Sequence, residues 1–219
     1  MLTIYGCYRS RATRPLWLLG EAGAAFDHVP VIQAYRLPDP QAPDAPLNTA
    51  SRAFLAVNPL GQIPAMAEDG LVLTESLGIV LYLAKRHGGD LGPRDLAEDA
   101  QMVQWTLLAA TAVEPAAVEM LMSVMAGQRD TPEGAARMAA AAERLARPLA
   151  RIEAHLGEAD WLVGGRFTAA DINLAECLRY AQTHPTLIGG YPAVGAWLAR
   201  CQARPAFAAM MAAREAEPA

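Results

Sequence analysis

Residues 58–76 have the sequence NPLGQIPAMAEDGLVLTES, and this stretch decides the fold of the first half of the chain. It begins as a loop with two prolines, after which Asp69-Gly70 separates two short apolar runs. An Asp-Gly pair between such runs is a strong signal for a tight β-hairpin turn. Thr74-Glu75-Ser76 then precedes a pattern with apolar residues at helical spacing. The stretch therefore predicts a loop, an antiparallel hairpin and a helix, in this order.

The residues before this stretch alternate between strand and helix patterns. A helix is expected to begin near residues 11–14, because the missing N–H of Pro15 is harmless only in a first helical turn. Gly23 is a typical residue just after a helix C-terminus. The elements predicted for the first half are strands at 2–5 and 29–34, helices at 11–22 and 50–56, the hairpin strands 66–68 and 71–73, and a helix at 76–86. Strand–helix–strand order implies parallel pairing, whereas the hairpin adds antiparallel strands.

Beyond residue 86, a Gly/Pro-rich segment is followed by a chain without strand patterns. Pro115 and Pro148 fall inside helical patterns, so we expect bends there. Helices are predicted near 94–126, 131–156, 169–182 and 192–203. The sequence thus predicts an α/β domain over 1–86, a linker over 87–97 and an all-helical domain over 98–219.

Composition excludes several classes of protein. Of the 219 residues, 53% are hydrophobic, and the formal net charge is −5. A nucleic-acid binder needs a basic face, so no nucleic-acid partner is expected. Cys7, Cys177 and Cys201 are widely spaced and the four histidines lie far apart, which predicts neither disulfides nor a metal site. We see no signal peptide and no apolar run near the ~18 residues that span a bilayer. A cytoplasmic protein without a membrane partner is expected.

Two candidate reactive groups lie near the first predicted helix. Ser10 is just before its start, where free backbone N–H groups and the helix dipole stabilise an anion. An N-cap serine with a purely structural role has the same pattern. Cys7 lies nearer the strand, where a buried and inert cysteine is the more common state.

Two further candidates lie within 58–76. Pro64 precedes a strand, and a cis bond there would present the backbone of Ile63 to a ligand, although only ~5–6% of such bonds are cis. Glu75 and Ser76 stand at a helix start, where a carboxylate, a hydroxyl and free N–H groups suit an α-amino acid head group. Ordinary helix capping explains the same residues.

In the second half, Thr168 and Asp171 match a capping box, and we interpret them as structural. Trp105 lies on a long apolar helix, where an aromatic residue belongs more often to a core than to a ligand pocket.

The order of these motifs resembles that of the cytosolic glutathione S-transferase family, in a bacterial serine-type or theta-like class. The resemblance covers nearly the whole chain and implies an N-terminal thioredoxin-like domain, β-α-β-α-β-β-α, followed by an all-helical domain. The segments that carry it are SRATRPLWLL (10–19), NPLGQIP (58–64), TESLGIVLYLAKR (74–86) and WLVGGRFTAADI (161–172).

The resemblance also implies roles for single residues. Ser10 matches the hydroxyl that hydrogen-bonds the glutathione thiolate, and Ile63 matches the residue whose backbone pairs with the cysteinyl part of glutathione. Asp171 matches the structural capping acid. The other matches are Pro64 as the cis proline, Gln62 near the remaining polar groups of the peptide, and Glu75 with Ser76 at the γ-glutamyl head. The family's basic residue at the glycyl end has no clear match, and Arg36 and Arg52 are candidates.

The implied function is transfer of glutathione, as cosubstrate and without a metal, to a small hydrophobic electrophile in detoxification. Trp105 is a candidate for the electrophile pocket. A homodimer is implied by the family and is favoured by the apolar excess of the 94–126 helix. Two alternatives remain: a non-catalytic glutathione-binding or interaction protein of the same fold, and a glutathione-dependent disulfide or peroxide reductase.

Overall fold

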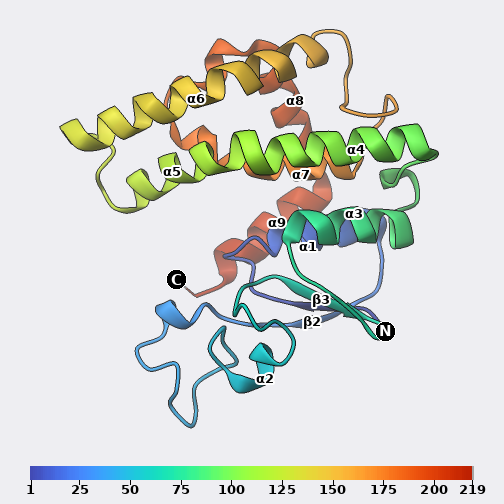
Figure 1. The fold of residues 1–219 in the computed structure, drawn as a ribbon, viewed down its shortest axis with the longest axis vertical. Coiled ribbons are helices and arrows are strands. Elements are labelled where there is room, and N and C mark those ends of the chain that lie inside the picture. The colour runs from blue at the N-terminus through green and yellow to red at the C-terminus, as the bar shows by residue number, and fades with distance from the viewer. Residues whose placement is uncertain (219) are drawn as a thin grey trace. The chain divides into compact units, whose positions relative to one another are not determined.

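A computed structural model describes residues 1–218 of the chain, and Figure 1 shows its fold. Contacts divide the chain into two compact units, with the division between Gly89 and Asp90, inside the predicted linker 87–97. The first unit also includes the C-terminal segment from Pro205 onward, and the second unit ends at Arg204. Each unit is described separately below.

The first unit is built on a four-stranded sheet with the order β2-β1-β3-β4. Its elements are β1 (Thr3–Tyr5), α1 (Thr13–Ala22), β2 (Asp27–Val29), α2 (Arg52–Leu55), β3 (Ala65–Glu68), β4 (Leu71–Leu73) and α3 (Ser76–His87). β1 pairs with β2 in parallel and with β3 in antiparallel orientation. α1 and α3 lie on one face of the sheet and α2 on the other (Figure 1). The predicted β-α-β-α-β-β-α order and the thioredoxin-like fold are confirmed.

The predicted hairpin turn forms as expected. β3 and β4 pair antiparallel, with Glu68 opposite Leu71. Asp69 and Gly70 between them have φ angles of 49° and 88°. A two-residue hairpin turn needs positive φ at both central residues, and Asp-Gly accepts this geometry at low cost. This turn sets the register that leads into α3.

The second strand differs from the prediction. We predicted a strand over 29–34, whereas β2 spans Asp27–Val29. Pro30 has no N–H to donate to a ladder, so the strand ends before it. Val31 is then fully buried beneath the sheet, and Ile32 forms only an isolated bridge with Asn48.

The last helix, α9 (Pro205–Ala216), is absent from the predicted elements. It packs on α1, where the rings of Trp17 and Phe207 lie 4.8 Å apart at 67°. Trp17 is fully buried by this contact and its neighbours. By its contacts α9 belongs to the first unit, whereas the sequence places it in a domain over 98–219.

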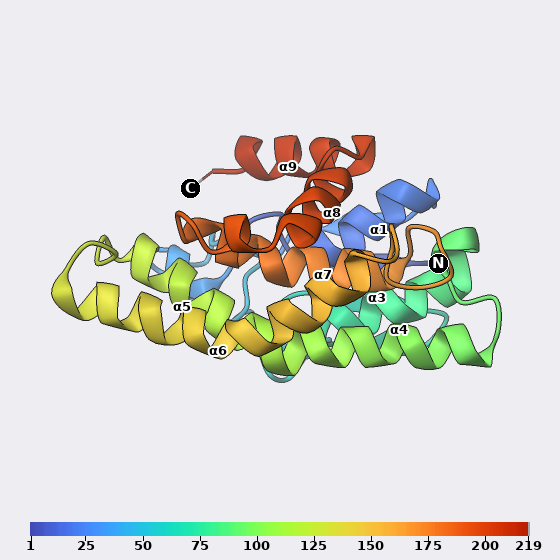
Figure 2. The same cartoon turned by 90° about the horizontal axis from the view of Figure 1, so that it is seen from above.

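The second unit is entirely helical apart from loops in its described residues. Its α-helices are α4 (Leu96–Leu108), α5 (Glu114–Met125), α6 (Pro132–Leu156), α7 (Ala169–Arg179) and α8 (Pro192–Gln202). α5 and α6 lie side by side (Figure 2). The all-helical character predicted for this part of the chain is confirmed.

The predicted helix over 94–126 is continuous but irregular. A π-helical turn, Ala109–Val113, separates α4 from α5. Pro115 lacks an N–H, and its ring would clash with the carbonyl four residues earlier in a regular helix, so a wider turn relieves the clash. Leu96–Met125 has a mean hydropathy of 1.5 over 18 residues, which is enough in length and composition to cross a membrane. Core helices of soluble proteins reach the same values, and the uncharged run within this helix, residues 100–113, is shorter than 18 residues, so the expectation of no apolar run of that length is not contradicted.

The predicted capping box is confirmed, and it centres on a fully buried carboxylate. Asp171 Oδ2 accepts hydrogen bonds from the backbone N–H (2.9 Å) and hydroxyl (3.0 Å) of Thr168. Its Oδ1 accepts from the Leu162 N–H (3.1 Å) and the Trp197 indole N–H (2.9 Å). Burial raises the pKa of Asp171 to about 6, while these donors favour the charged form. One side chain thus joins the loop before α7, the start of α7 and α8.

We predict that Asp171→Asn destabilises the protein by about 3 kcal/mol, because its amide would set a donor against groups that also donate. Urea denaturation followed by circular dichroism measures the change. Asp44→Asn, at an exposed carboxylate, is the control. Equal unfolding midpoints for Asp171→Asn and the unmodified protein would contradict the role assigned to Asp171.

A bidentate ion pair fixes the start of α4. Both oxygens of Glu98 accept from the Arg166 guanidinium, at 2.8 and 2.6 Å, and both side chains are less than one-fifth exposed. The same guanidinium donates to the carbonyls of Asp90 (2.9 Å) and Gly92 (2.8 Å). The hydrogen bonds from Arg166, and next the one from the Arg94 N–H, lower the pKa of Glu98 to about 2.

A lowered pKa means that this stabilisation is present above the unfolded-state value near 4.3 and is lost as pH falls toward 2. We predict that Glu98→Gln costs about 3 kcal/mol at pH 7, and that the gap to the unmodified protein narrows by about 2 kcal/mol by pH 3. Urea titrations at several pH values measure the gap. Glu133→Gln, at an exposed residue, should show no such narrowing. A pH-independent gap for Glu98→Gln would refute the pair's contribution.

Candidate functional site

Ser10 lies in the loop between β1 and α1, a short distance before the helix begins. Its Oγ donates to the Cys7 carbonyl (2.6 Å) and accepts from the Ala12 N–H (3.0 Å). The hydroxyl therefore stabilises the turn before α1. The N-cap of α1 is Ala12, without a side-chain cap hydrogen bond, so the N-cap role of the structural alternative does not fall to Ser10. The Ser10 hydroxyl can serve a bound anion only when its proton turns away from the Cys7 carbonyl.

The loop can take this path because of Gly6. This residue has φ 151°, and a Cβ on it would lie 2.8 Å from the Ala12 Cβ and 3.6 Å from the Pro64 Cα. Only glycine allows so close an approach in this backbone conformation. The end of β1, the start of α1 and the loop before β3 therefore meet at one point.

The Ile63–Pro64 peptide bond is cis, as predicted. The loop is held by Asn58, which is buried and whose amide donates to the Gln62 carbonyl (2.7 Å) and accepts from the Leu60 N–H (3.1 Å). Pro64 is buried, Ile63 is half-buried and Gln62 is exposed. The backbone of this loop thus has a defined shape beside Gly6.

The start of α3 is unusual in its backbone. Glu75, its N-cap, has φ 63° and ψ 99° and an exposed side chain. A non-glycine residue in such a region costs on the order of 1–3 kcal/mol, and such residues cluster at functional sites. The observation supports a ligand-binding role for Glu75 over simple capping.

Ser76 follows as the first residue of α3 and is buried. Its Oγ accepts a hydrogen bond of 2.8 Å from the guanidinium of Arg14, which is 1% exposed on α1. Sequence reasoning did not single out Arg14. The available signal was an arginine among the buried positions of the 11–22 helix, since a buried cation needs polar partners.

Cys7 is buried, and its thiol donates to the Gln33 amide oxygen (3.3 Å). Burial, and then the charge of Glu217, raise the pKa of Cys7, although the Arg36 guanidinium at 4.0 Å acts in the opposite direction. The thiol is therefore held protonated. Arg36 thus lies beside the loop that holds Ser10, whereas Arg52 is exposed on α2.

Trp105 is 4% exposed on α4. Its ring lies 4.9 Å from the His155 ring and 5.3 Å from the Arg151 guanidinium, both on α6. These contacts place it in the packing of the helical unit. Its role in an electrophile pocket stays a prediction.

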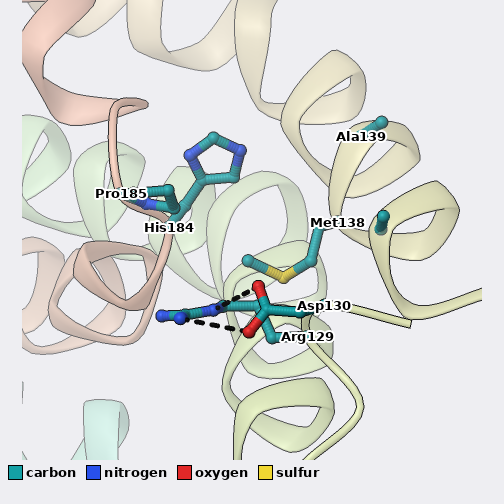
Figure 3. A pocket seen from close by; sticks show the side chains of 7 residues that line it. Arg129, Asp130, Met138, Ala139, His184 and Pro185 are labelled. Atoms are coloured by element: carbon teal, nitrogen blue, oxygen red, sulfur yellow. Dashed lines mark hydrogen bonds and ion pairs between the residues drawn. The ribbon is translucent and has the colours of Figure 1, made fainter. Parts of the chain in front are cut away.

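A hollow of about 300 Å³ lies in the helical unit, and Figure 3 shows its lining. Arg129 and Asp130 form an ion pair there, with N–O distances of 3.1 and 3.3 Å. His184 uses Nδ1 to accept the N–H groups of Thr186 (3.3 Å) and Leu187 (3.1 Å), so this nitrogen stabilises its own loop. None of the predicted site residues lines this hollow.

No metal centre is indicated by the part of the chain that the structure describes, residues 1–218, since no three His, Cys, Asp or Glu side chains gather there. The predicted glutathione-binding residues instead belong to the first unit, on segments connected with the start of α1. At Gly6, Pro64 comes close to the start of α1, and Arg14 joins α1 to Ser76 at the start of α3. A hydroxyl, a cis-proline backbone and a polar helix start thus lie together in the thioredoxin-like unit, an arrangement that agrees with the resemblance described above.

Comparisons with known proteins agree with this geometry. Residues 8–86 match the family model described as glutathione S-transferase, N-terminal domain, and residues 110–205 match glutathione S-transferase, C-terminal domain. Glutathione S-transferase 3 of Zea mays is 34% identical over 97% of this chain and 94% of its own length. The chain therefore belongs to the cytosolic glutathione S-transferase family.

Solved structures show the same similarity. The crystal structure of glutathione transferase F7 from Populus trichocarpa has a TM-score of 0.80 and 29% identity, and covers 98% of this chain and 99% of its own. A theta class glutathione S-transferase from Xanthomonas axonopodis pv. citri, with glutathione bound, has a TM-score of 0.76 and 32% identity, over 94% of each chain.

Proposed function

We propose that the protein is a glutathione transferase that binds glutathione as its cosubstrate and activates the thiol beside Ser10. The observation that carries this proposal is the junction at Gly6, where the Ser10 loop meets the cis Ile63–Pro64 bond. The Xanthomonas relative, whose structure contains glutathione, supports the choice of ligand.

The γ-glutamyl head of glutathione is assigned to the start of α3. The exposed Glu75 carboxylate suits the ammonium group. Because Ser76 Oγ already accepts from Arg14, its own proton is available to donate to the α-carboxylate, and the buried guanidinium adds positive charge behind it. The backbone of Ile63, before Pro64, is assigned to the cysteinyl part, and Gln62 to the remaining polar groups of the peptide.

In the proposed mechanism, Ser10 turns its hydroxyl from the Cys7 carbonyl to the glutathione sulfur and donates a hydrogen bond to it. The thiol proton leaves to solvent, and the thiolate is stabilised by this bond and by the positive end of α1. The sulfur then attacks the electrophile and forms the new C–S bond while a leaving group departs with its electron pair. Ser10 keeps its proton throughout, so its contribution is a lower thiol pKa.

The substrate is proposed to be a small hydrophobic electrophile, in keeping with a detoxification role in the cytoplasm. The helical unit is expected to supply the residues that select it, with Trp105 as one candidate. The apolar helix Leu96–Met125 supports a soluble protein, because Met102, Val113 and Met120 on it are buried in the helical unit.

The two alternatives are separated by the reaction that the protein performs. A reductase that uses its own cysteine needs an accessible and readily ionised thiol, whereas Cys7, the cysteine of the first unit, is buried and has a raised pKa. Assays with an aryl halide, a disulfide and a peroxide, together with binding to a glutathione matrix, decide among transfer, reduction and binding alone. Binding without turnover of any of the three would favour the non-catalytic alternative.

We predict that Ser10→Ala raises the apparent pKa of bound glutathione and lowers turnover, because one charge-assisted hydrogen bond of about 1.5–3 kcal/mol is lost. The pH–rate profile with an aryl halide measures both effects. Cys7→Ala is the matched control and should keep most of the activity. An unchanged pH profile in Ser10→Ala would transfer the role to Tyr8 or Cys7.

We predict a two-fold homodimer whose interface includes the α4–α5 helix. Met122 (55%) and Met125 (72%) are largely exposed on α5, as is Leu107 (56%) on α4. Exposed apolar side chains on one helix suit an isologous contact. Light scattering should give twice the chain mass of 23.3 kDa, and Met122→Glu with Met125→Glu should weaken the dimer.

Ala146→Glu, which adds one negative charge at an exposed position of α6, is the control for each α5 substitution and should leave the mass unchanged. A mass of one chain for the unmodified protein would reject the dimer. A dimer unaffected by the α5 substitutions would reject this interface.

A further inference from the structure

The C-terminal segment of the chain lies directly on the loop that holds Ser10. After α9 ends at Ala216, the Glu217 carboxylate accepts two hydrogen bonds from successive backbone N–H groups. Oε1 accepts from Tyr8 at 2.6 Å and Oε2 accepts from Arg9 at 2.8 Å. Two N–H groups that hold both oxygens of one carboxylate form an anion-binding site, whose present occupant is the chain's own tail.

Three arginines surround this contact. The Arg9 Nε donates to the Glu217 carbonyl (2.9 Å), Arg36 donates to the Pro218 carbonyl (2.6 Å), and Arg214 donates to the Tyr8 carbonyl (2.7 Å). These hydrogen bonds go to neutral carbonyl groups. Arg36 also donates to the neutral amide oxygen of Gln33 (3.2 Å). Positive charge is therefore concentrated around the Glu217 carboxylate.

This site adjoins the proposed reacting atoms. Tyr8 and Arg9 immediately precede Ser10, so their N–H groups lie within about 8 Å of its Cα by chain geometry alone. The negative charge of Glu217 also adds to the effect of burial in raising the pKa values of Cys7 and Tyr8. A carboxylate at this site therefore acts electrostatically on groups close to Ser10.

We propose that the N–H groups of Tyr8 and Arg9, with the Arg9 and Arg36 side chains, form a carboxylate-binding subsite that Glu217 occupies in the resting protein. A carboxylate of the electrophile or of glutathione replaces Glu217 during turnover. The inference rests on the proposed transferase function and specifies a ligand chemistry for it. It also predicts that the tail is a competitor whose removal improves binding.

The expected change in ligand affinity follows from the fraction of time that Glu217 occupies the subsite. When a tethered group covers a site nine-tenths of the time, a free ligand binds with an apparent dissociation constant about tenfold higher than the intrinsic one. Neutralising or deleting Glu217 should remove this competition. The effect should be confined to ligands that carry a carboxylate.

Two variants test this proposal: Glu217→Gln and a chain that ends at Ala216. Glu215→Gln is the matched control, because it removes the same charge from an exposed side chain two residues away. The electrophiles are 4-chloro-3-nitrobenzoate and its neutral methyl ester. If the carboxylate comes from the electrophile, both tail variants should raise kcat/KM for the acid about three- to tenfold relative to the ester.

If the carboxylate comes from glutathione, KM for glutathione should fall with both electrophiles. That gain should disappear when the glycyl carboxylate of glutathione is esterified. The proposal would be overturned if the tail variants changed neither the kcat/KM for the acid relative to the ester nor the KM for glutathione. An equal effect of Glu215→Gln would also overturn it.

A second readout does not depend on turnover. The backbone amide NMR signals of Tyr8 and Arg9 should shift between the unmodified protein and Glu217→Gln. In the variant they should shift again on titration with 4-chloro-3-nitrobenzoate and not with its ester. If the Tyr8 and Arg9 amide signals did not respond to the acid, the subsite would be overturned. If they responded but the protein turned over no electrophile, only the transferase function would be refuted.

Discussion

The approach of three segments at Gly6 is the constraint on which the candidate site depends. The end of β1, the start of α1 and the cis-proline loop come so close there that a single Cβ would lie 2.8 Å from Ala12. Because Gly6 has no side chain, the Ser10 hydroxyl and the Ile63 backbone belong to one small region. A larger residue at this point would separate the group proposed to stabilise the thiolate from the group proposed to hold the peptide.

The remaining support of the site is polar and buried. Arg14 on α1 donates to Ser76 on α3. This bond joins α1, which follows the Ser10 loop, to the start of α3, where the γ-glutamyl head is proposed to bind. A buried guanidinium is costly without partners, so this contact constrains how α1 and α3 pack. The backbone strain at Glu75 is held in place by this packing and by the hairpin that precedes it.

The helical unit uses the same strategy at a different position. Asp171 has four donors around its buried carboxylate, drawn from the loop before α7, from the N-cap residue of α7 and from α8. The ion pair of Glu98 with Arg166 fixes the start of α4. Each unit therefore combines an apolar core with polar contacts that specify how its elements meet, since an alternative packing would leave buried charges unpaired.

The sequence by itself determined the order of the elements up to the end of α3, the Asp69-Gly70 turn, the end of α1 at Gly23 and the capping box of α7. These features depend on residues a few positions apart, whose backbone preferences and local hydrogen bonds act before any distant contact forms. The resemblance to a known family, carried by short motifs, added the cis Pro64 and the candidate site residues. The end of β2 was misplaced although Pro30 was visible, because buried Val31 continued the apolar pattern of a strand.

Only the tertiary structure decided which distant residues meet. Arg14 finds Ser76 across 62 positions, and Glu217 reaches Tyr8 across 209. α9 packs against Trp17 in the first unit, and no local pattern marks it as part of that unit. Such contacts depend on how whole elements pack, and a helical or charged segment has the same local sequence whichever surface it covers. For that reason the sequence indicated the residues around the proposed glutathione site, while the structure alone placed the side-chain carboxylate of Glu217 beside them.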